Sequence, residues 1–432
     1  MRILLLGGTG FIGRHVAARL LSEGHALVLA VKEPERARRR FPQAEAQVET
    51  MAIDLARDTD PDIWLPRLAG IDAVVNAAGL LRGPGIDAVH RDGPAALYQA
   101  CAQAGVKRVI HISAAGADEA ANTDYARSKA AAETWLRGRD DLDWLILRPS
   151  LVYHQGSYGG TSLMRGLAGL PGCVALPGDG AMAFHPIHAE DLAAGIAECL
   201  QRPELKHICF EPGGPERLSL REMVLAWRAW LDLPPAPVLR LPLPLLHLAG
   251  WLGDRLGSGP ISQTSLRQLQ HGAAGDAGPW LQTIQHPHLR FADALALQPS
   301  HTAERWQARL YFLRPLARAA LVLLWLLSGL IGLLAEPNAT AAVRALLGLP
   351  DAAHAPLLYA FCVLDIGLAL ALLRRWGDAF ARAAMQAAVV LGYSLVLSIA
   401  QPDLWLEPLG PLLKNLPILV LILVDAAWEE DR

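Results

Sequence analysis

The sequence predicts an α/β fold with a doubly wound parallel sheet and a smaller second lobe, followed by an all-α bundle of four membrane helices. Two observations predict this. In roughly the first 300 residues, short apolar runs alternate with amphipathic helical stretches, which is the pattern of a parallel sheet covered by helices. After about residue 315 the chain carries four apolar stretches, each close to the roughly 20 residues that a membrane-spanning helix needs.

Length and composition limit the class of protein. A chain of 432 residues is too long for one ordinary core. We expect a soluble domain over 1–300, with its smaller substrate lobe mainly at 150–185 and 203–300, and a membrane domain over 301–432. The net charge of −3 argues against nucleic acid as a partner. The five cysteines form no C-x-x-C pair, so we expect neither a metal centre nor a disulfide framework.

The alternation can be followed along the soluble region. Strands are predicted at 2–6, 26–31, 48–52, 73–76, 109–113 and 144–148, and helices at 13–23, 88–104 and 125–137, among others. Ser219 and Glu222 have the spacing of a helix capping box. The segment 241–252 is very apolar but short and rich in proline. It fits core, the lining of a lipophilic pocket or the membrane surface, and we expect core.

A glycine turn follows the first strand and leads into an amphipathic helix. Residues 7–13 read Gly-Gly-Thr-Gly-Phe-Ile-Gly, which satisfies both G-x-G-x-x-G and G-x-x-G-x-x-G. Glycines let the backbone turn sharply and approach a pyrophosphate, and the helix N-terminus attracts the phosphates. This turn indicates a Rossmann-type sheet that binds a dinucleotide. The expected contacts in the turn are Gly7, Thr9, Gly10, Phe11, Ile12 and Gly13.

The ends of the next strands indicate which dinucleotide binds. Lys32 stands where chains that prefer NAD carry an acidic residue, so it would meet the 2′-phosphate of NADP(H), which we expect over NAD(H). The basic run 38–40 is interpreted as a solvated helix face. Asp54 would either accept from the adenine amino group or cap a turn. Small residues after the fourth strand would let the backbone pass close to the cofactor. The residues at that end are Asn76, Ala77 and Ala78.

Three residues suggest proton transfer chemistry. Ser113 ends the fifth predicted strand, and Tyr125 and Lys129 lie four apart on one face of the following helix. A nearby ammonium group favours the phenolate and lowers the pKa of a tyrosine. Tyr125 would then act as a general acid or base near neutral pH, and the Ser113 hydroxyl would hold a substrate carbonyl.

Together these segments resemble an extended-type short-chain dehydrogenase/reductase over most of the first 220 residues. The supporting segments are the glycine turn, 76–79, Ser113, 125–129, 147–153 and 186–193. They are most similar to the atypical branch that includes the accessory dehydrogenase-like subunit of respiratory complex I. The resemblance implies bound NADP(H), contacted also by Tyr125, Lys129 and Pro149, and a catalytic set of Ser113, Tyr125 and Lys129. It also implies a homodimer, and some atypical members hold the nucleotide without turnover.

The apolar region predicts an integral membrane protein. The four expected spans are 315–335, 356–373, 383–400 and 408–427. Basic residues precede the first span and fill the second connection, so these ends should face the cytoplasm. We therefore expect a bacterial inner-membrane protein whose dehydrogenase domain and both termini are cytoplasmic.

The membrane region resembles the DoxX-like family over roughly the last 120 residues, most specifically at 410–417. Some relatives are linked to quinone reduction. Polar groups in a bilayer are costly and are candidates for a ligand site. These candidates are Asp365, Lys414 and Asn415. Asp365 and Lys414 could pair across the bundle, and the alternative is that such groups only hold helices together.

These observations favour a membrane-anchored NADP(H)-dependent oxidoreductase. Its substrate would be the carbonyl or alcohol of a lipophilic small molecule, with a quinone, an isoprenoid or a fatty molecule as the leading classes. One alternative is an NADPH-binding structural or sensory membrane protein without turnover. Another is an epimerase or dehydratase with tightly held NAD, against which Lys32 argues.

Overall fold

The chain divides into two compact units, Met1–Arg309 and Leu310–Arg432. The computed structural model describes residues 1–41, 47–81, 83–156, 159–255, 274–334, 341–346, 350–408 and 410–429, together with Gln263, Leu266 and Gly348. The division falls after residue 300 because the helix α13 (Thr302–Leu310) packs on the first unit. A Cβ at Gly169 would lie only 2.7 Å from the Ala308 carbonyl carbon.

The first unit is built on a parallel sheet of seven described strands, in the order β11-β6-β5-β4-β1-β2-β3. The strands are β1 (Arg2–Leu6), β2 (Ala26–Val31), β3 (Val48–Ala52), β4 (Ala73–Asn76), β5 (Arg108–Ile112), β6 (Asp143–Leu147) and β11 (Ile208–Phe210). The predicted doubly wound sheet is confirmed, with β5 and β6 each starting one residue earlier than expected. The winding reverses between β1 and β4, where ligands of such sheets bind beyond the carboxyl ends of the strands.

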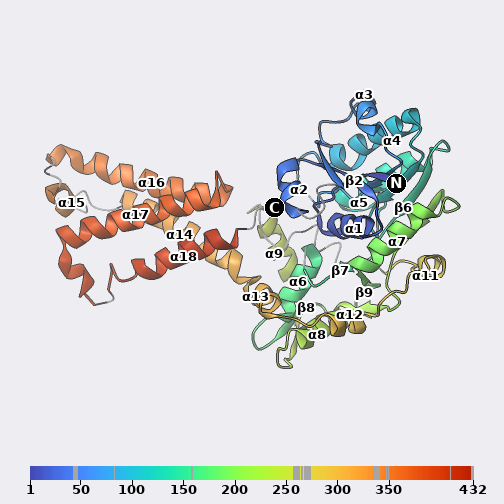
Figure 1. Ribbon diagram of the computed structural model, residues 1–432. Coiled ribbons are helices and arrows are strands. Elements are labelled where there is room, and N and C mark those ends of the chain that lie inside the picture. Colours follow the sequence, from blue (N-terminus) through green and yellow to red (C-terminus); the bar gives the residue numbers. More distant parts are fainter. Residues whose placement is uncertain are drawn as a thin grey trace. The chain divides into compact units, whose positions relative to one another are not determined.

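Helices cover both faces of this sheet (Figure 1). Alternate side chains of β1 face opposite ways: Ile3 and Leu5 join one core cluster, and Leu4 and Leu6 join the other. The first cluster includes α1 (Phe11–Ser22), α2 (Pro34–Arg40) and α7 (Ala189–Gln201). The second includes α3 (Pro61–Trp64), the short helix η2 (Leu65–Leu68), the π-helical turn η3 (Ala88–Asp92), α4 (Gly93–Ala104) and α5 (Asp124–Arg137). Burial on both faces explains the nearly continuous apolar strands.

The smaller lobe follows β6 and combines short strands with helices. Its strands are β7 (Val152–Tyr153), β8 (Val174–Pro177), β9 (Ala183–Phe184), β10 (Ile187–His188), β12 (Leu218–Ser219) and β13 (Val238–Leu241). Its helices are α6 (Gly159–Ala168), α8 (Leu220–Trp230), α9 (Leu243–Arg255), α11 (Gly278–Thr283) and α12 (Phe291–Leu297). The predicted capping box is confirmed, because Ser219 and Glu222 exchange side-chain and backbone hydrogen bonds at the start of α8.

The apolar segment 241–252 does not form core along its whole length. In α9, Leu246 is buried, but Leu245, Leu248 and Trp251 are each 44–54% exposed. The expectation of core is therefore wrong for this outward face. Its apolar residues lie at intervals of three, on the side of the helix that turns away from Leu246.

The second unit is a helical bundle with the character of a membrane domain. Its helices are α14 (Leu313–Leu334), α15 (Ala341–Leu346), α16 (His354–Arg374), α17 (Ala379–Ala400) and α18 (Asn415–Trp428), with short turns η5 (Asp351–Ala353) and η6 (Pro402–Trp405). Among the described residues, three segments are long and apolar enough to span a membrane: Leu313–Leu334, Ala355–Arg374 and Ala379–Ala400. The fourth predicted span, 408–427, contains only the 14-residue helix α18, because residues 410–414 form hydrogen-bonded turns.

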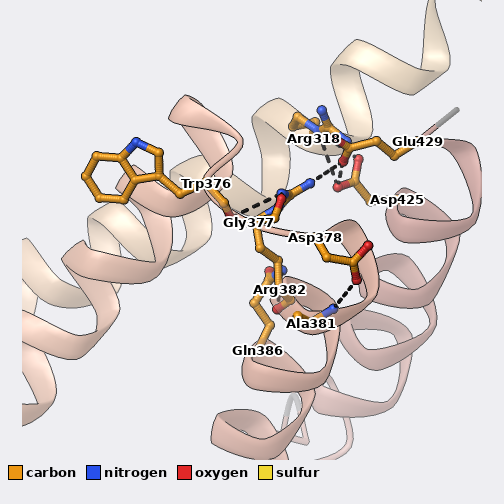
Figure 2. Close-up of polar contacts among 9 residues, drawn as sticks. All are labelled: Arg318, Trp376, Gly377, Asp378, Ala381, Arg382, Gln386, Asp425 and Glu429. Atoms are coloured by element: carbon orange, nitrogen blue, oxygen red, sulfur yellow. Dashed lines mark hydrogen bonds and ion pairs between the residues drawn. The ribbon is translucent and has the colours of Figure 1, made fainter. Parts of the chain in front are cut away.

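One end of the bundle is closed by charged side chains (Figure 2). Arg318, near the start of α14, pairs with Asp425 at 3.1 Å and with Glu429 at 2.8 Å. Arg382, near the start of α17, pairs with Glu429 at 2.5 Å and donates to the Trp376 carbonyl. The starts of α14 and α17 therefore meet the ends of α16 and α18. The end of the short helix α18 therefore lies beside the start of α14.

Candidate nucleotide and catalytic site

The glycine turn has a shape that side chains would prevent. Gly7 has φ +71°, and the Gly10 N–H donates to its carbonyl at 2.9 Å. A Cβ at Gly13 would lie 2.1 Å from the Gly7 oxygen, and one at Gly7 would lie 2.7 Å from the Ala77 oxygen. The first turn of α1 therefore packs on Gly7, and Gly7 packs on the backbone that follows β4. Gly10 caps α1 without a side-chain bond, which leaves N–H groups available to an anion.

Two arginines stand beside this turn, and neither was expected to take part. Arg40 donates to the Thr9 carbonyl at 2.9 Å, so the basic run of α2 is more than a solvated face. The Arg14 guanidinium lies 5.3 Å over the Phe11 ring, and burial and the Arg40 charge lower its pKa. Their mutual repulsion would be relieved by a bound phosphate. The position of Arg14 directly after Gly13 was the sequence signal for this role.

Lys32 and Asp54 form an ion pair at the ends of β2 and β3. The Lys32 ammonium lies 3.1 Å from the Asp54 carboxylate, which also accepts from the Ala56 N–H at 3.1 Å. Bonding to Lys32 and to this turn lowers the pKa of Asp54 although its partial burial acts the other way. Asp54 therefore shapes the turn after β3, and its contact with adenine stays a prediction. The Lys32 side chain is 65% exposed, so a 2′-phosphate could compete with Asp54 for it.

The end of β4 is held by the buried amide of Asn76. Its nitrogen donates to the Tyr98 hydroxyl at 3.0 Å, and its oxygen accepts from the Ala78 N–H at 3.1 Å. Tyr98 in turn lies 2.7 Å from Nδ1 of His111. The Asn76 side chain is 1% exposed, so it sets the backbone path of 76–78. Contact between this backbone and the nucleotide stays a prediction.

Lys129 connects two strand ends beneath the expected nucleotide. Its ammonium donates to the Ile112 oxygen at 3.0 Å and to the Ala78 oxygen at 3.2 Å. Burial lowers the pKa of Lys129 to about 8, against the attraction of Glu133. Tyr125 lies one turn earlier on the same face of α5, near the Thr123 N-cap. The pair has the charge relationship that a tyrosine acid or base needs.

His90 is a member of this site that the sequence analysis missed. Its Nε2 accepts from the Leu80 N–H at 2.9 Å, so Nδ1 carries the proton and donates to Ser128 at 2.8 Å. Burial and the Lys129 charge lower the pKa of His90 to about 3. Its ring meets the Tyr125 ring edge-on at 5.6 Å. A single histidine between Val89 and Arg91 gave no sequence signal for this position.

Ser113 takes an unexpected partner. Its hydroxyl donates to the Glu133 carboxylate at 2.5 Å, and Glu133 is held by Arg148 at 2.6 Å. Glu133 lies eight residues after Tyr125, about 12 Å along α5. To orient a substrate carbonyl, the Ser113 hydroxyl would have to leave Glu133. The catalytic role of Ser113 stays a prediction, and the structure brings only Tyr125 and Lys129 together on one face.

A group of three side chains near α1 resembles a metal site but does not suit one. Single ligand atoms of His15, His154 and Glu190 all lie within 4.8 Å of one another. However, Nδ1 of His154 accepts from the Gly156 N–H at 3.3 Å. Its Nε2 therefore carries the proton and donates to Glu190 at 3.3 Å. A metal would need the electron pair that this proton occupies.

The polar groups of the bundle bond to one another. Asp365 accepts from Ser328 at 2.6 Å and from Tyr393 at 3.1 Å, so the suggested pair with Lys414 is wrong. Lys414 is exposed at the N-cap of α18, far along the chain from the middle of α16. Asn415 donates to Ser394 at 2.8 Å. These bonds link neighbouring helices, and a ligand role for the three predicted residues stays untested.

Comparisons with known families give one match in each of the two units. Residues 7–203 match the NAD(P)H-binding family, and residues 322–423 match the DoxX-like family. The first unit thus contains an NAD(P)H-binding region on a Rossmann-type parallel sheet, and a DoxX-like region follows it. The expected nucleotide-binding domain and the expected DoxX-like region are confirmed.

The curated relatives are reductases and dehydrogenases, among others. The chain is 29% identical over 261 residues to the ceramide reductase of Caulobacter vibrioides, which covers 59% of this chain and 78% of the relative. It is 29% identical over 269 residues to the chloroplastic divinyl chlorophyllide a 8-vinyl-reductase of Zea mays, covering 59% and 65%. It is 28% identical over 185 residues to a 3β-hydroxysteroid dehydrogenase/isomerase of Mycobacterium tuberculosis, covering 36% and 48%.

A solved structure shares the fold of the first unit. The dTDP-glucose 4,6-dehydratase DesIV of Streptomyces venezuelae, with NAD bound, superposes with a TM-score of 0.54 at 21% identity. The match covers 72% of this chain and 98% of that one. At this identity the likeness shows the fold alone.

Proposed function

We propose that this chain, a short-chain dehydrogenase/reductase domain joined to a DoxX-like membrane domain, is a membrane-anchored NADP(H)-dependent oxidoreductase. It would act on the carbonyl or alcohol of a lipophilic small molecule. The observation that carries the proposal is the Lys129 ammonium, buried at the ends of β4 and β5 and one helical turn from Tyr125. A buried ammonium group beside a dinucleotide turn, with its pKa lowered to about 8 by burial, is the kind of perturbed group that gathers at functional sites.

The residues have distinct tasks in the reduction of a carbonyl. The bound nicotinamide supplies the hydride that the carbonyl carbon accepts. Tyr125 donates its hydroxyl proton to the carbonyl oxygen, and the phenolate that remains is stabilised by the Lys129 charge. Tyr125 then regains a proton from solvent. In the oxidative direction the same groups act in reverse, with Tyr125 as the base.

Basic side chains support a preference for NADP(H). Lys32 is exposed at the end of β2, and Arg40 and Arg14 stand at the glycine turn. An additional phosphate near Lys32 would gain a charge-assisted bond but would compete with Asp54. Arg40→Gln and Lys32→Gln should each weaken NADPH binding more than NADH binding.

Fusion to a membrane domain supports a lipophilic substrate. Two relatives are named for activity on ceramide and on hydroxysteroids. The substrate classes that we propose are quinone-like, isoprenoid or long-chain lipid molecules. The basic ends of the spans and the pairing of Arg318 and Arg382 at one end of the bundle support cytoplasmic placement of both termini. In a bacterium this corresponds to the inner membrane.

The test is nucleotide oxidation by the full chain in lipid nanodiscs. NADPH and NADH would be compared, with and without a short-chain quinone analogue or a long-chain ketone. We expect substrate-dependent loss of NADPH that disappears in Tyr125→Phe. Unchanged turnover in Tyr125→Phe would overturn the proposed chemistry.

The bond from Ser113 to Glu133 favours one second candidate, a nucleotide-binding structural or sensory protein without turnover. In this case NADPH would stabilise the first unit without being consumed. Tight NADPH binding with no consumption by the full chain would favour this candidate, and turnover that depends on Tyr125 would exclude it. Where turnover is found, Ser113→Ala tests the role of the serine. If Ser113 stays on Glu133, the variant should lose only a few-fold in turnover, whereas a carbonyl-orienting hydroxyl is worth about 100-fold.

A further inference from the structure

The outward face of α9 differs from an ordinary water-exposed helix surface. Leu245, Leu248 and Trp251 are 54%, 54% and 44% exposed, and Leu243 is 42% exposed. The segment 241–252 contains no charged residue. Surface helices in water carry charged side chains on their outer face. Adjacent exposed apolar side chains of this kind indicate an interaction surface.

The inner face of the same helix is already packed. Leu246 is 7% exposed and Gly250 is buried one turn later, so this side of the helix is covered. Just before the helix, Leu239 of β13 is also 49% exposed. The leucines of the outward face, Leu243, Leu245 and Leu248, stay about half exposed beside the described part of this unit.

The first unit is tethered close to the bilayer. Ala308 of α13 is 2% exposed and packs against Gly169, and Arg305 pairs with Asp232 at 3.5 Å. The first membrane-spanning helix begins at Leu313. Only four residues separate the buried Ala308 from Leu313, so their Cα atoms lie at most about 18 Å apart. Exposed Trp306 lies two residues before Ala308. In Figure 1, α9 and α13 lie at the same edge of the first unit.

We propose that the outward face of α9 is a membrane-surface helix that docks the dehydrogenase unit on the leaflet from which α14 enters the bilayer. Leucine and tryptophan are the residues that insert at the lipid interface, and tryptophan prefers the level of the headgroups. The polar face that a free amphipathic helix needs is not required here, because the side that carries Leu246 and Gly250 is already buried. Since the tether already holds the unit at the surface, a few apolar side chains suffice to fix its orientation. The proposal concerns docking and does not depend on turnover.

The experiment measures contact between Trp251 and lipid in the full chain. Protein in nanodiscs of phosphatidylethanolamine and phosphatidylglycerol is compared with protein in nanodiscs whose lipid chains are brominated near the headgroup. The fluorescence of Trp251 is the difference between the wild type and Trp251→Phe. We expect brominated lipid to reduce this difference signal about twofold or more. The matched control is Trp135→Phe, whose residue is partly exposed on α5 and should show no lipid quenching.

A second variant keeps the test independent of one side chain. Leu245→Ser together with Leu248→Ser should abolish the quenching of Trp251 while NADPH binding stays unchanged. A Trp251 signal that brominated lipid does not quench overturns the proposal. Soluble acrylamide then distinguishes the two remaining cases. If acrylamide quenches Trp251, the face of α9 lies in water. If acrylamide does not quench it, the face is covered by a second copy of the chain. The quenching results can be interpreted even if the proposed oxidoreductase activity is not found.

Discussion

The two units bury polar groups in different ways. In the first unit, backbone turns and strand ends bring polar groups to one open edge: the Gly7 turn, the path after Asn76, and Lys129 across two strands. In the second unit, side chains from different helices satisfy one another, as in Arg318 with Asp425 and Ser328 with Asp365. The first arrangement leaves the N–H groups at the start of α1 without a side-chain cap, and the second links neighbouring helices. We therefore propose that the chemistry belongs to the first unit and anchoring to the second.

The largest effect should come from the residue that transfers the proton. Tyr125→Phe should lower turnover by about 100-fold or more and leave NADPH affinity within a few-fold, because only the hydroxyl is lost. Turnover and NADPH binding would be measured on the same nanodisc preparation. Tyr359→Phe, an exposed tyrosine of α16, is the matched control. Equal turnover of both variants would remove the chemistry from the first unit.

A change in the charged cluster of the bundle should lower stability and leave nucleotide binding unchanged. Arg382→Gln leaves Glu429 with Arg318 alone and should destabilise the second unit by about 2 kcal/mol, since an uncompensated charge at a mostly buried position is costly. NADPH affinity should not change. Unfolding in mixed detergent micelles checks the first statement, and Arg374→Gln, exposed at the end of α16, is the control. If Arg382→Gln and Arg374→Gln leave the bundle equally stable, the charged cluster does not stabilise it.

The glycine turn gives a sharp test of backbone geometry. Gly13→Ala places a Cβ 2.1 Å from the Gly7 oxygen, so the turn must shift and NADPH binding should weaken by about tenfold or more. Gly138→Ala follows α5 where the nearest atom would lie at an ordinary 3.5 Å, and it should bind NADPH normally. Nucleotide titration by fluorescence compares the two. Similar affinities in both variants would contradict the assigned binding turn.

The pH dependence of turnover should report Lys129. Its pKa is lowered to about 8 by burial, so the ammonium that stabilises the Tyr125 phenolate is lost as pH rises through about 8. Reductive turnover should therefore fall several-fold above this pH. In Lys129→Arg, whatever turnover remains should keep no such alkaline limb, because a guanidinium stays charged. A flat profile in the wild type would show that the Lys129 charge is not used.

The smallest expected effect concerns acid stability. His90 stays neutral in the folded chain down to a pKa of about 3, whereas an unfolded histidine takes up a proton below about 6.5. The stability that this contributes is complete above about 6.5 and is lost as pH falls, by at most about 1.4 kcal/mol per pH unit. His90→Asn should thus narrow the difference in Tm between about pH 7 and about pH 5. An unchanged difference would mean that other groups, such as His15, dominate.

The sequence was most informative where local pattern decides structure. The strands of the sheet follow from apolar runs between turns, and the face shared by Tyr125 and Lys129 follows from helical spacing alone. The strand β11 was missed because three residues give no periodicity. The shortening of α18 was also missed, because the apolar stretch that contains it continues through the turns before Asn415.

Side-chain partners far apart in sequence were not predictable. The rotamer of Ser113 depends on Glu133, which lies 20 residues later and is itself placed by Arg148. Asp365 accepts hydrogen bonds from hydroxyl groups on α14 and α17. The sequence analysis had suggested a pair with Lys414 because the two charges are opposite. Arg14 and His90 were overlooked for another reason. Arg14 was taken as part of an amphipathic helix, and His90 was not singled out at all.

The most direct test of the central claim follows one hydrogen atom. NADPH deuterated at C4 of the nicotinamide would be supplied to the full chain in nanodiscs with a long-chain ketone or a quinone analogue, and the product analysed by mass spectrometry. The account predicts deuterium at the former carbonyl carbon of the ketone, or NADPH-dependent formation of the quinol, in the wild type and not in Tyr125→Phe. Tight binding of NADPH with no product from any probe, or equal product from both proteins, would contradict it.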